Sequence, residues 1–308
     1  MRKPVIIDCD PGHDDAIALL LAFANDKLDV KAVTTVAGNQ TIEKTFNNAL
    51  KVLSFAGINT VVSKGAEKPL LRDLITAPEV HGDSGLDGPE LPPPNFKPSS
   101  KNAVETIMEV INESNEKITI IPTGPLTNIA TVLLSNPEIK AKIERIVLMG
   151  GSMIGGNWTP AAEFNILVDP EAASIVFNSG VPITMCGLDV THKAQIYKEE
   201  VEEIRNIGNK VAIMVAELLD FYGKFHERFG FKGMPLHDPV AVAYVIDPTI
   251  VTTQSFYVEI EIKGEFTNGC TVVDYYDVLK KPKNVEVVLD IDRERFIKML
   301  YDAMRKYN

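Results

Sequence analysis

The chain has 308 residues, of which 45% are hydrophobic and 24% are charged, as is typical of a soluble globular protein. Its formal net charge of −11 argues against a polyanionic partner such as DNA or RNA, whereas a small neutral ligand stays open. Three scattered cysteines, Cys9, Cys186 and Cys270, are too few for a disulfide framework or a zinc site. We therefore expect free thiols and a cytoplasmic location.

The longest unbroken apolar run, Ala16–Ala24, is far too short to cross a bilayer, and the sequence predicts no membrane partner. Apolar β-branched segments alternate with helical patterns through the first two thirds of the chain. Strands separated by single helices predict right-handed crossovers and a mostly parallel sheet with helices on both faces, which is a Rossmann-like α/β fold. The predicted strands are Val5–Asp8, Val30–Val36, Thr60–Ser63, Ile118–Pro122, Arg145–Leu148 and Pro182–Cys186. The predicted helices are Asp14–Ala24, Thr41–Ala56, Asn102–Ser114, Pro125–Leu134 and Glu171–Asn178.

The last third of the chain changes character. Long helices continue to about Phe229, and a strand-rich stretch then predicts an antiparallel hairpin that turns at Lys263–Gly264. No polar linker divides the chain, so we expect one domain over residues 1–308 with an antiparallel addition near its C-terminus. The remaining predicted elements are a helix Pro239–Val245, the stretch Ile250–Val273, a strand Val285–Leu289 and an amphipathic helix Arg293–Lys306.

An acidic segment lies between the first strand and the first helix. Asp8, Asp10, Asp14 and Asp15 fall within eight positions, and like charges this close repel one another. A divalent cation would remove the repulsion, and carboxylate oxygens suit Ca²⁺ or Mg²⁺. Favourable placement in the first turn of a helix would account for Asp14 and Asp15 but not for Asp8 and Asp10.

Further polar segments follow the other predicted strands. Ligands of open parallel sheets bind at the carboxyl ends of the strands, so these segments predict one shared crevice. They comprise the loop at Asn39, the long loop His81–Gly88, the turn Pro122–Asn128, and Met149–Gly151 together with Asn157–Asn165.

The sequence Asp-Cys-Asp-Pro-Gly-His-Asp-Asp-Ala at residues 8–16 resembles the N-terminal motif of the inosine–uridine-preferring nucleoside hydrolases. These enzymes cleave the N-glycosidic bond of ribonucleosides. The segment Pro235–Pro239 resembles the family's His-Asp-Pro signature, and the polar segments between follow the family's order over essentially the whole chain. Two alternatives remain open: a haloacid-dehalogenase-like phosphohydrolase, which also begins with Asp-x-Asp, and a nucleoside-binding protein of the same fold that has lost catalysis.

The resemblance implies a Ca²⁺ site held by the carboxylates of Asp10, Asp15 and Asp238 and by the backbone carbonyl of Thr123. It also implies that Asp10 is the general base for the attacking water. For Asp238, the structural alternative is an ordinary helix N-cap before Pro239. Asp8 is expected to be a supporting residue.

The ribose contacts implied by the resemblance come from several loops. Asp14 and Asn165 would bind the 2′- and 3′-hydroxyls, with help from Asn39, for which an ordinary loop asparagine is the alternative. The 5′-hydroxyl would be held from a segment that we expect to be non-helical and to have little structural reason for collecting amide and acid groups. The residues that would hold the 5′-hydroxyl are Asn157 and Glu163, and Met149 would pack beneath the sugar ring.

For the leaving base, the resemblance implies His237 and His81 as proton or hydrogen-bond donors. Tyr222 and His226, from the predicted helix Asp220–Phe229, are candidate base contacts, although an aromatic stripe at helical spacing is usually core packing. The family's purine-specialised branch tends to lack the histidine at His237 and to stack the base between tryptophans. This chain has one tryptophan, Trp158, so a pyrimidine-preferring or broad enzyme is expected, acting as a homo-oligomer (dimer or tetramer).

Overall fold

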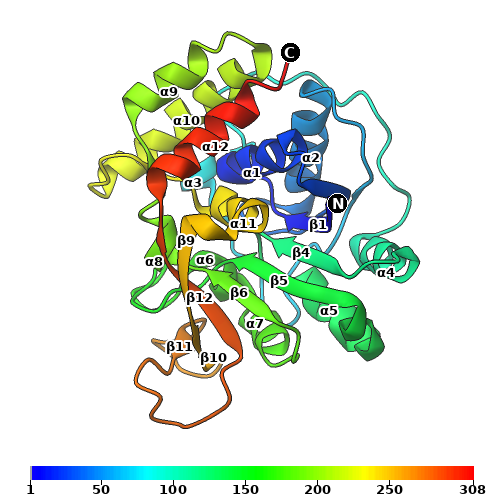
Figure 1. Cartoon of the computed structure of the whole chain (residues 1–308), viewed down its shortest axis with the longest axis vertical. Helices are drawn as coiled ribbons and strands as arrows, with labels where there is room; N and C mark the ends of the chain where they lie inside the picture. Colours follow the sequence, from blue (N-terminus) through cyan, green and yellow to red (C-terminus); the bar gives the residue numbers. More distant parts are fainter. Residues whose placement is uncertain (1) are drawn as a thin grey trace.

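The computed structural model describes residues 2–308 and contains one sheet of eight strands in the order β3-β2-β1-β4-β5-β6-β12-β9 (Figure 1). Neighbouring strands are parallel except for β9, which runs antiparallel to β12 at the edge. The predicted mostly parallel α/β sheet is therefore confirmed. The strands are β1 Lys3–Cys9, β2 Leu28–Thr35, β3 Val62–Ser63, β4 Ile118–Pro122, β5 Ile143–Met149, β6 Ile183–Cys186, β9 Val251–Phe256 and β12 Val285–Ile291.

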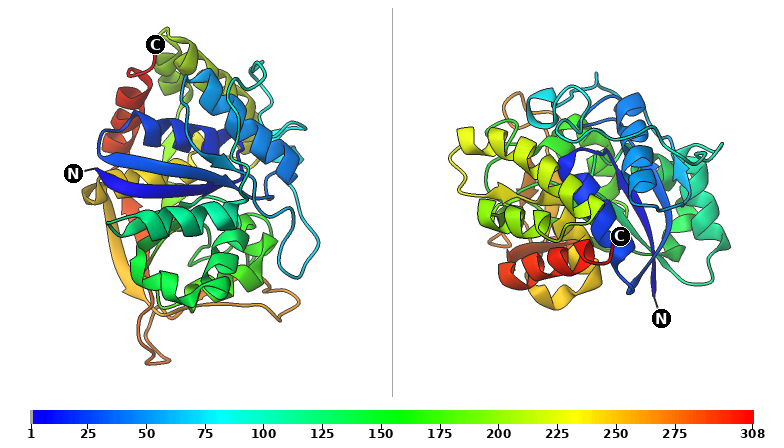
Figure 2. Two further views of the ribbon diagram at one scale, coloured as in Figure 1. Left: turned by 90° about the vertical axis from the view of Figure 1, so that its right-hand side faces the viewer. Right: turned by 90° about the horizontal axis from the view of Figure 1, so that it is seen from above.

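The two faces of the sheet are covered by different helices (Figure 2). Along β1, Val5 and Ile7 pack into one core and Ile6 into the other, because successive side chains of a strand point to opposite faces. The first core includes residues of α1 His13–Ala24, α2 Ile42–Phe55, α9 Lys198–Arg205, α10 Lys210–Arg228, α11 His237–Ile246 and α12 Arg293–Met304. The second includes residues of α4 Ala103–Glu113, α5 Thr127–Ser135 and α7 Pro170–Phe177.

The predicted strands and helices occur close to their expected positions, with shifted ends. The main difference is β3, which is reduced to two residues because only Val62 and Ser63 pair with β2. Cys9 and Cys186 end β1 and β6 as buried free thiols, whereas Cys270 is partly exposed. Short elements that the periodicity did not predict are α3 Pro78–His81, α6 Phe164–Val168, α8 Leu188–Thr191, β7 Gln195–Ile196, β8 Met234–Pro235 and the 3₁₀ helices Pro137–Lys142 and Pro248–Ile250.

The prediction for the strand-rich stretch was partly wrong. An antiparallel pair does form, between β10 Val258–Ile260 and β11 Thr271–Val273, and Lys263–Gly264 lies in the connection between them. The preceding strand β9, however, joins the main sheet. The chain leaves that sheet at Val258 because the Asn284 side-chain amide, rather than a strand backbone, bonds both the Val258 N–H and its C=O, at 2.8 Å and 2.9 Å.

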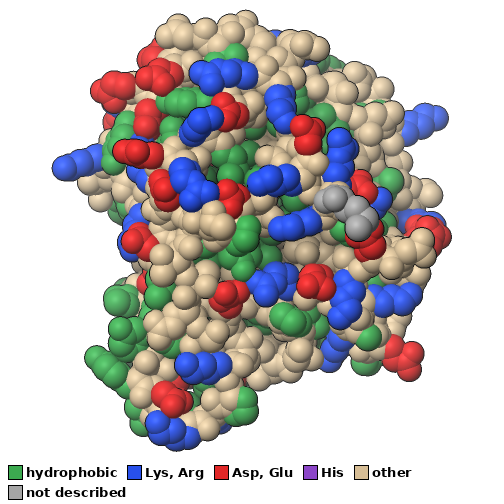
Figure 3. All heavy atoms as spheres, viewed as in Figure 1, with side chains coloured by type: hydrophobic (Ala, Val, Ile, Leu, Met, Phe, Trp, Pro, Cys, Tyr) green, Lys and Arg blue, Asp and Glu red, His purple; other side chains and the backbone are tan. Residues whose placement is uncertain are grey.

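The β10–β11 unit projects from the lower end of the molecule in the view of Figure 1, and apolar side chains gather on this part of the surface in Figure 3. Across residues 2–308, no helix combines the length and the apolarity needed to cross a bilayer. The exposed apolar side chains of this projection are Phe266, Val272, Tyr275, Tyr276, Val278 and Leu279.

Candidate active site at the carboxyl ends of the strands

A cavity of about 520 Å³ opens at the carboxyl edge of the parallel strands and has two unlike sides. The acidic side presents Asp14 and Asp238 with polar groups from Asn39, Thr123 and Asn165. The lining also includes a group of aromatic and histidine rings, here called the aromatic side, which consists of His81, His192, Tyr222, Phe225, His226, Phe229, Phe231 and His237. The remaining lining comes mainly from the segment 156–165.

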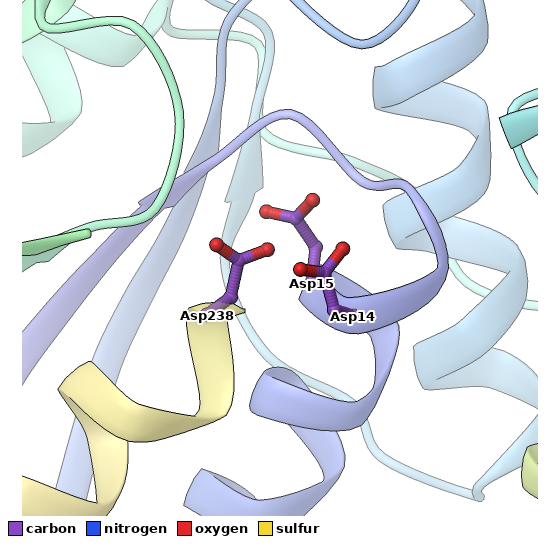
Figure 4. Close-up of side chains that lie close together, drawn as sticks. All are labelled: Asp14, Asp15 and Asp238. Carbon is purple, nitrogen blue, oxygen red and sulfur yellow. The ribbon is translucent and has the colours of Figure 1, made fainter. Parts of the chain in front are cut away.

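Three carboxylates meet on the acidic side (Figure 4). Asp14 and Asp15 lie in the first turn of α1, and Asp238 lies in the first turn of α11, which packs against α1. One carboxylate oxygen from each residue lies within 4.8 Å of the other two, and all three side chains are buried. The figure shows them directed toward a common space, which is a geometry suited to a cation.

Burial is the main reason why the carboxyl groups of this site have raised pKa values. It raises the pKa of Asp14 to about 7, and the neighbouring charge of Asp15 adds to the shift. The pKa values of Asp10 and Asp238 are raised well above the usual range for the same two reasons, burial and repulsion between the carboxylates. A bound cation would relieve this repulsion and stabilise the ionised forms.

Asp10 is fully buried behind the lining residue Asn39. The Asn39 backbone N–H donates to Asp10 Oδ2 at 2.7 Å, whereas Asp10 Oδ1 has no hydrogen-bond partner within residues 2–308. Two glycines permit this position, because a Cβ atom at Gly124 would lie 2.5 Å from Oδ1 and one at Gly38 would lie 2.2 Å from Oδ2. A buried acceptor without a partner is costly, and a cation or water at Oδ1 would satisfy it.

Asp15 is held by hydrogen bonds on both of its oxygens. Thr123 Oγ1 donates to Oδ1 at 2.8 Å, and Gly12 N–H and Asn39 Nδ2 donate to Oδ2 at 3.0 Å and 3.1 Å. Asn39 therefore orients two acids, Asp10 and Asp15. The Thr123 carbonyl lies in the same group, where it accepts a hydrogen bond from Asn165 Nδ2 at 2.8 Å. The atoms that could bind a cation here are all oxygens, the ligand atoms that Ca²⁺ and Mg²⁺ prefer.

The predicted residues of the segment 156–165 line the cavity, and the segment is non-helical up to Glu163 as expected, but its last two residues begin α6. Glu163 is the N-cap of α6, and its carboxylate accepts from the backbone N–H groups of Asn165 at 2.9 Å and Ile166 at 3.2 Å. It also accepts from Gly151 at 2.9 Å, and burial raises its pKa to about 7. Glu163 thus has a structural reason to be there, which the sequence pattern did not reveal.

The amides on either side of Glu163 keep one polar atom free. Asn157 Oδ1 accepts from the Phe164 N–H at 3.0 Å, which leaves its Nδ2 as a donor. Asn165 Nδ2 donates to the Thr123 and Met149 carbonyls, which leaves its Oδ1 as an acceptor. Both residues line the cavity, so their free atoms are available to hydroxyl groups of a ligand.

Asp8 lies apart from the other acids. Its Oδ1 accepts from Thr34 Oγ1 at 2.5 Å and from Asn128 Nδ2 at 2.8 Å, and its Oδ2 is buried without a partner. Burial raises its pKa to about 7. It ties β1 to β2 and to the start of α5, beneath the cavity.

Tyr222 of α10 connects the two sides of the cavity. Its hydroxyl lies 3.5 Å from Asp14 Oδ2, and its ring packs on His226 at a centroid distance of 4.3 Å. The same ring stacks on His13 and His81, at 5.6 Å and 5.7 Å. The predicted aromatic stripe of this helix is thus both core packing and cavity wall.

All five histidines of the chain lie in one cluster around this wall. Burial lowers the pKa of His81 and His237 well below the usual value and that of His226 to about 4, so these rings are neutral at pH 7. His81 contacts His13 through their Nδ1 atoms at 3.1 Å. His237 Nδ1 lies 2.8 Å from Thr191 Oγ1.

Thr191 and His192 lie near the cavity and were not among the predicted site residues. Thr191 and His192 follow β6 through the short helix α8, so a sixth strand contributes its carboxyl end to the site. The signal was present, since both residues lie in the short segment that follows the predicted parallel strand Pro182–Cys186. The predicted crevice drew on the ends of only five strands.

Comparison with known proteins gives a consistent result. Residues 5–298 match the family model described as inosine-uridine preferring nucleoside hydrolase. The chain is 56% identical to a pyrimidine-specific ribonucleoside hydrolase RihA of Shewanella sp. (strain ANA-3), over 100% of this chain and 98% of that protein. It is 54% identical to the protein of the same name from Escherichia coli O1:K1 / APEC, with both chains fully covered. Among solved structures, a purine-preferring ribonucleoside hydrolase from Gardnerella vaginalis is 34% identical, with a TM-score of 0.93 and 98% of each chain covered.

Proposed function

This chain belongs to the inosine–uridine-preferring nucleoside hydrolase family, and we propose that it hydrolyses pyrimidine ribonucleosides in a calcium-dependent reaction. It is a ribonucleoside hydrolase, and the phosphohydrolase alternative is therefore wrong. The observation that carries the proposal is the meeting of buried carboxylates from α1 and α11 at a cavity that also presents free amide groups.

The preference for pyrimidines is supported by the relatives. Proteins named pyrimidine-specific are 54% to 56% identical to this chain, whereas the purine-preferring structure is 34% identical. The only tryptophan, Trp158, packs on Phe164 at a ring-centroid distance of 4.8 Å, within the segment 156–165. A second tryptophan with which it could sandwich a purine does not exist in this sequence.

The cation would be held by Asp10, Asp15 and Asp238 together with the Thr123 carbonyl. The free Oδ1 of Asp10 and the mutual proximity of the Asp15 and Asp238 carboxylates support this set. A bound Ca²⁺ would offset the carboxylate charges and increase the acidity of water in the site. Asp14 is close enough to Asp15 and Asp238 to bind the cation as well, and we propose that it binds the ribose instead.

Asp10 would also act as the general base that takes the proton of the water attacking the sugar C1′. Asp14 and the free Oδ1 of Asn165 would accept hydrogen bonds from the ribose 2′- and 3′-hydroxyls. The free Nδ2 of Asn157 would hold the 5′-hydroxyl, near Glu163 and above Met149. As the C1′–N bond breaks, positive charge develops on the sugar, and the nearby carboxylates stabilise it.

The electron pair of the broken C1′–N bond passes to the base. His237 and His81 would stabilise the departing base by hydrogen bonding, because both rings line the cavity and are neutral. Tyr222 and His226 would shape the wall against which the base lies. The free thiols and the exposed apolar projection at β10–β11 support two further proposals, a cytoplasmic location and assembly into a dimer or tetramer.

A substrate panel tests this proposal. Purified protein is assayed with uridine, cytidine, inosine, adenosine and guanosine, before and after exhaustive chelation, and its metal content is measured by elemental analysis. We expect uridine or cytidine to have the highest kcat/KM, Ca²⁺ to be present in stoichiometric amount, and activity to return when Ca²⁺ is added back. A purine optimum, stoichiometric Zn²⁺, or full activity of the metal-free protein would each contradict one part of the proposal.

A further inference from the structure

Thr191 has a hydroxyl group with one hydrogen-bond partner. It is fully buried at the end of α8, and its Oγ1 lies 2.8 Å from His237 Nδ1. Within residues 2–308, no other side-chain or backbone group makes a hydrogen bond to this oxygen. Threonine in a helix often donates its hydroxyl to the carbonyl four residues earlier, but Thr191 Oγ1 makes no such bond to the Gly187 carbonyl, which accepts the backbone N–H groups of Val190 and Thr191.

The direction of this hydrogen bond follows from the need to satisfy a buried donor. If His237 Nδ1 carried a hydrogen and donated it to Thr191, the threonine hydroxyl hydrogen would have no acceptor. If the hydroxyl donates to a bare Nδ1, both groups are satisfied. A buried unsatisfied donor is unfavourable, so the second arrangement is preferred.

A neutral imidazole carries its single hydrogen on one nitrogen only. With Nδ1 bare, the hydrogen of His237 lies on Nε2. His237 Nε2 has no hydrogen-bond partner among the described residues, yet it is not one of their fully buried unpartnered atoms, which are Asp8 Oδ2, Asp10 Oδ1 and Asn268 Oδ1. Because His237 lines the cavity, Nε2 is the ring nitrogen that a ligand can reach.

We propose that Thr191 is a positioning residue that holds His237 in the Nε2–H form, so that the ring presents a hydrogen-bond donor to the leaving base. Thr191 does not touch the substrate and acts through His237. The inference rests on the proposed role of His237 and deepens it. It concerns where the hydrogen lies before the glycosidic bond breaks.

The chain provides its own hydroxyl-deleting control. Thr106, on α4, is also buried, and its Oγ1 lies 2.7 Å from Ser63 Oγ, outside the cavity. Thr191→Val and Thr106→Val remove the same hydroxyl from two buried sites with nearly unchanged volume. Thr191→Ser keeps the hydroxyl and removes only a methyl group.

Kinetics with two substrates separate positioning from general damage. We expect Thr191→Val to lower kcat for uridine by about tenfold to about 100-fold with little change in KM, and to spare p-nitrophenyl riboside, whose leaving group departs without help. Thr191→Ser should recover most of the lost rate, and Thr106→Val should match the wild type. Equal losses on both substrates, or a Thr191→Ser variant as slow as Thr191→Val, would overturn the proposal.

Nitrogen-15 NMR of histidine-labelled protein reads the hydrogen position directly, with the His237 signals assigned by comparison with His237→Ala. We expect Nδ1 to resonate as a bare imidazole nitrogen and Nε2 as a protonated one, and the Thr191→Val variant to lose this preference. Wild-type protein with the hydrogen on Nδ1 would refute the inference. A correct tautomer in an enzyme whose activity does not depend on His237 would instead refute the proposed catalytic role alone.

Discussion

The acidic side and the aromatic side of the cavity hold their polar groups in different ways. On the acidic side, Asp10 and Asp15 are fixed by backbone N–H groups, by Asn39 and by Thr123, which belong to three different strand ends. On the aromatic side, Tyr222 and the histidines pack ring against ring, and His226 and His237 each add a single hydrogen bond from Nδ1. Hydrogen-bonded carboxylates tolerate little change in geometry, whereas packed rings can be exchanged for others of similar size.

This difference indicates a division of tasks. The acidic side would perform the step common to all ribonucleosides, namely gripping the ribose and activating water. The aromatic side would decide which base is accepted and how easily it leaves. Changes on the acidic side should therefore affect every substrate alike, and changes on the aromatic side should depend on the base.

The largest effect is expected from Asp10→Asn. The substitution removes the proposed general base and one proposed cation ligand together, so kcat should fall at least ~10³-fold on every nucleoside while the fold is retained. Steady-state kinetics with circular dichroism measure both quantities. Asp26→Asn is a suitable control, since the Asp26 side chain is 80% exposed. Near-wild-type turnover in a folded, calcium-loaded Asp10→Asn protein would contradict the role of Asp10 as general base.

His237→Ala should separate the two sides. Natural nucleosides should lose about 10²–10⁴ in kcat, the usual range for general acid catalysis, because the departing base loses its donor. Binding of ribose and of Ca²⁺ should be almost unchanged. Turnover of p-nitrophenyl riboside serves as the internal control. If it falls as far as turnover of uridine, His237 acts in binding or structure, and the donor has to be sought at His81.

A substrate without the ribose 2′-hydroxyl tests whether the acidic side binds that group. We expect kcat/KM for 2′-deoxyuridine to be at least ~100-fold below that for uridine, because buried groups built around a hydroxyl are left unpaired without it. The deficit should persist in His237→Ala, since it originates on the other side of the cavity. Equal kcat/KM values for the two nucleosides would show that the acids do not hold the ribose.

The pH dependence of Ca²⁺ affinity tests the acidic side without any substitution. Burial and mutual repulsion raise the pKa of Asp14 to about 7 and those of Asp10 and Asp238 above the usual range when no cation is bound. A cation favours the ionised forms, so its binding should release protons, and affinity should increase with pH. We expect a loss of up to about tenfold per pH unit for each proton released between about pH 8 and about pH 6.

Calorimetric titrations in two buffers of different ionisation enthalpy count the released protons directly. Asp26→Asn should behave as the wild type, because Asp26 is remote from the carboxylate group and exposed. An affinity independent of pH over this interval would mean that the carboxylates are already ionised before the cation binds.

The sequence by itself determined the strand β1, the turn and the start of α1, because these elements and their four aspartates are adjacent along the chain. The alternating strands and helices also determined the parallel sheet, and with it the edge at which polar residues collect. The hydrophobic pattern carries this information locally, within windows of about one element.

Only the tertiary structure decided which distant groups meet. It brings Asp238 to Asp14 and Asp15 through the packing of α11 on α1, and it places Thr191 of α8 against His237. It also decided that Glu163 caps a helix and that β9 joins β12, because both depend on partners far away in sequence. Local patterns cannot specify such contacts, since the free energy that selects them comes from burial and hydrogen bonding between separate elements.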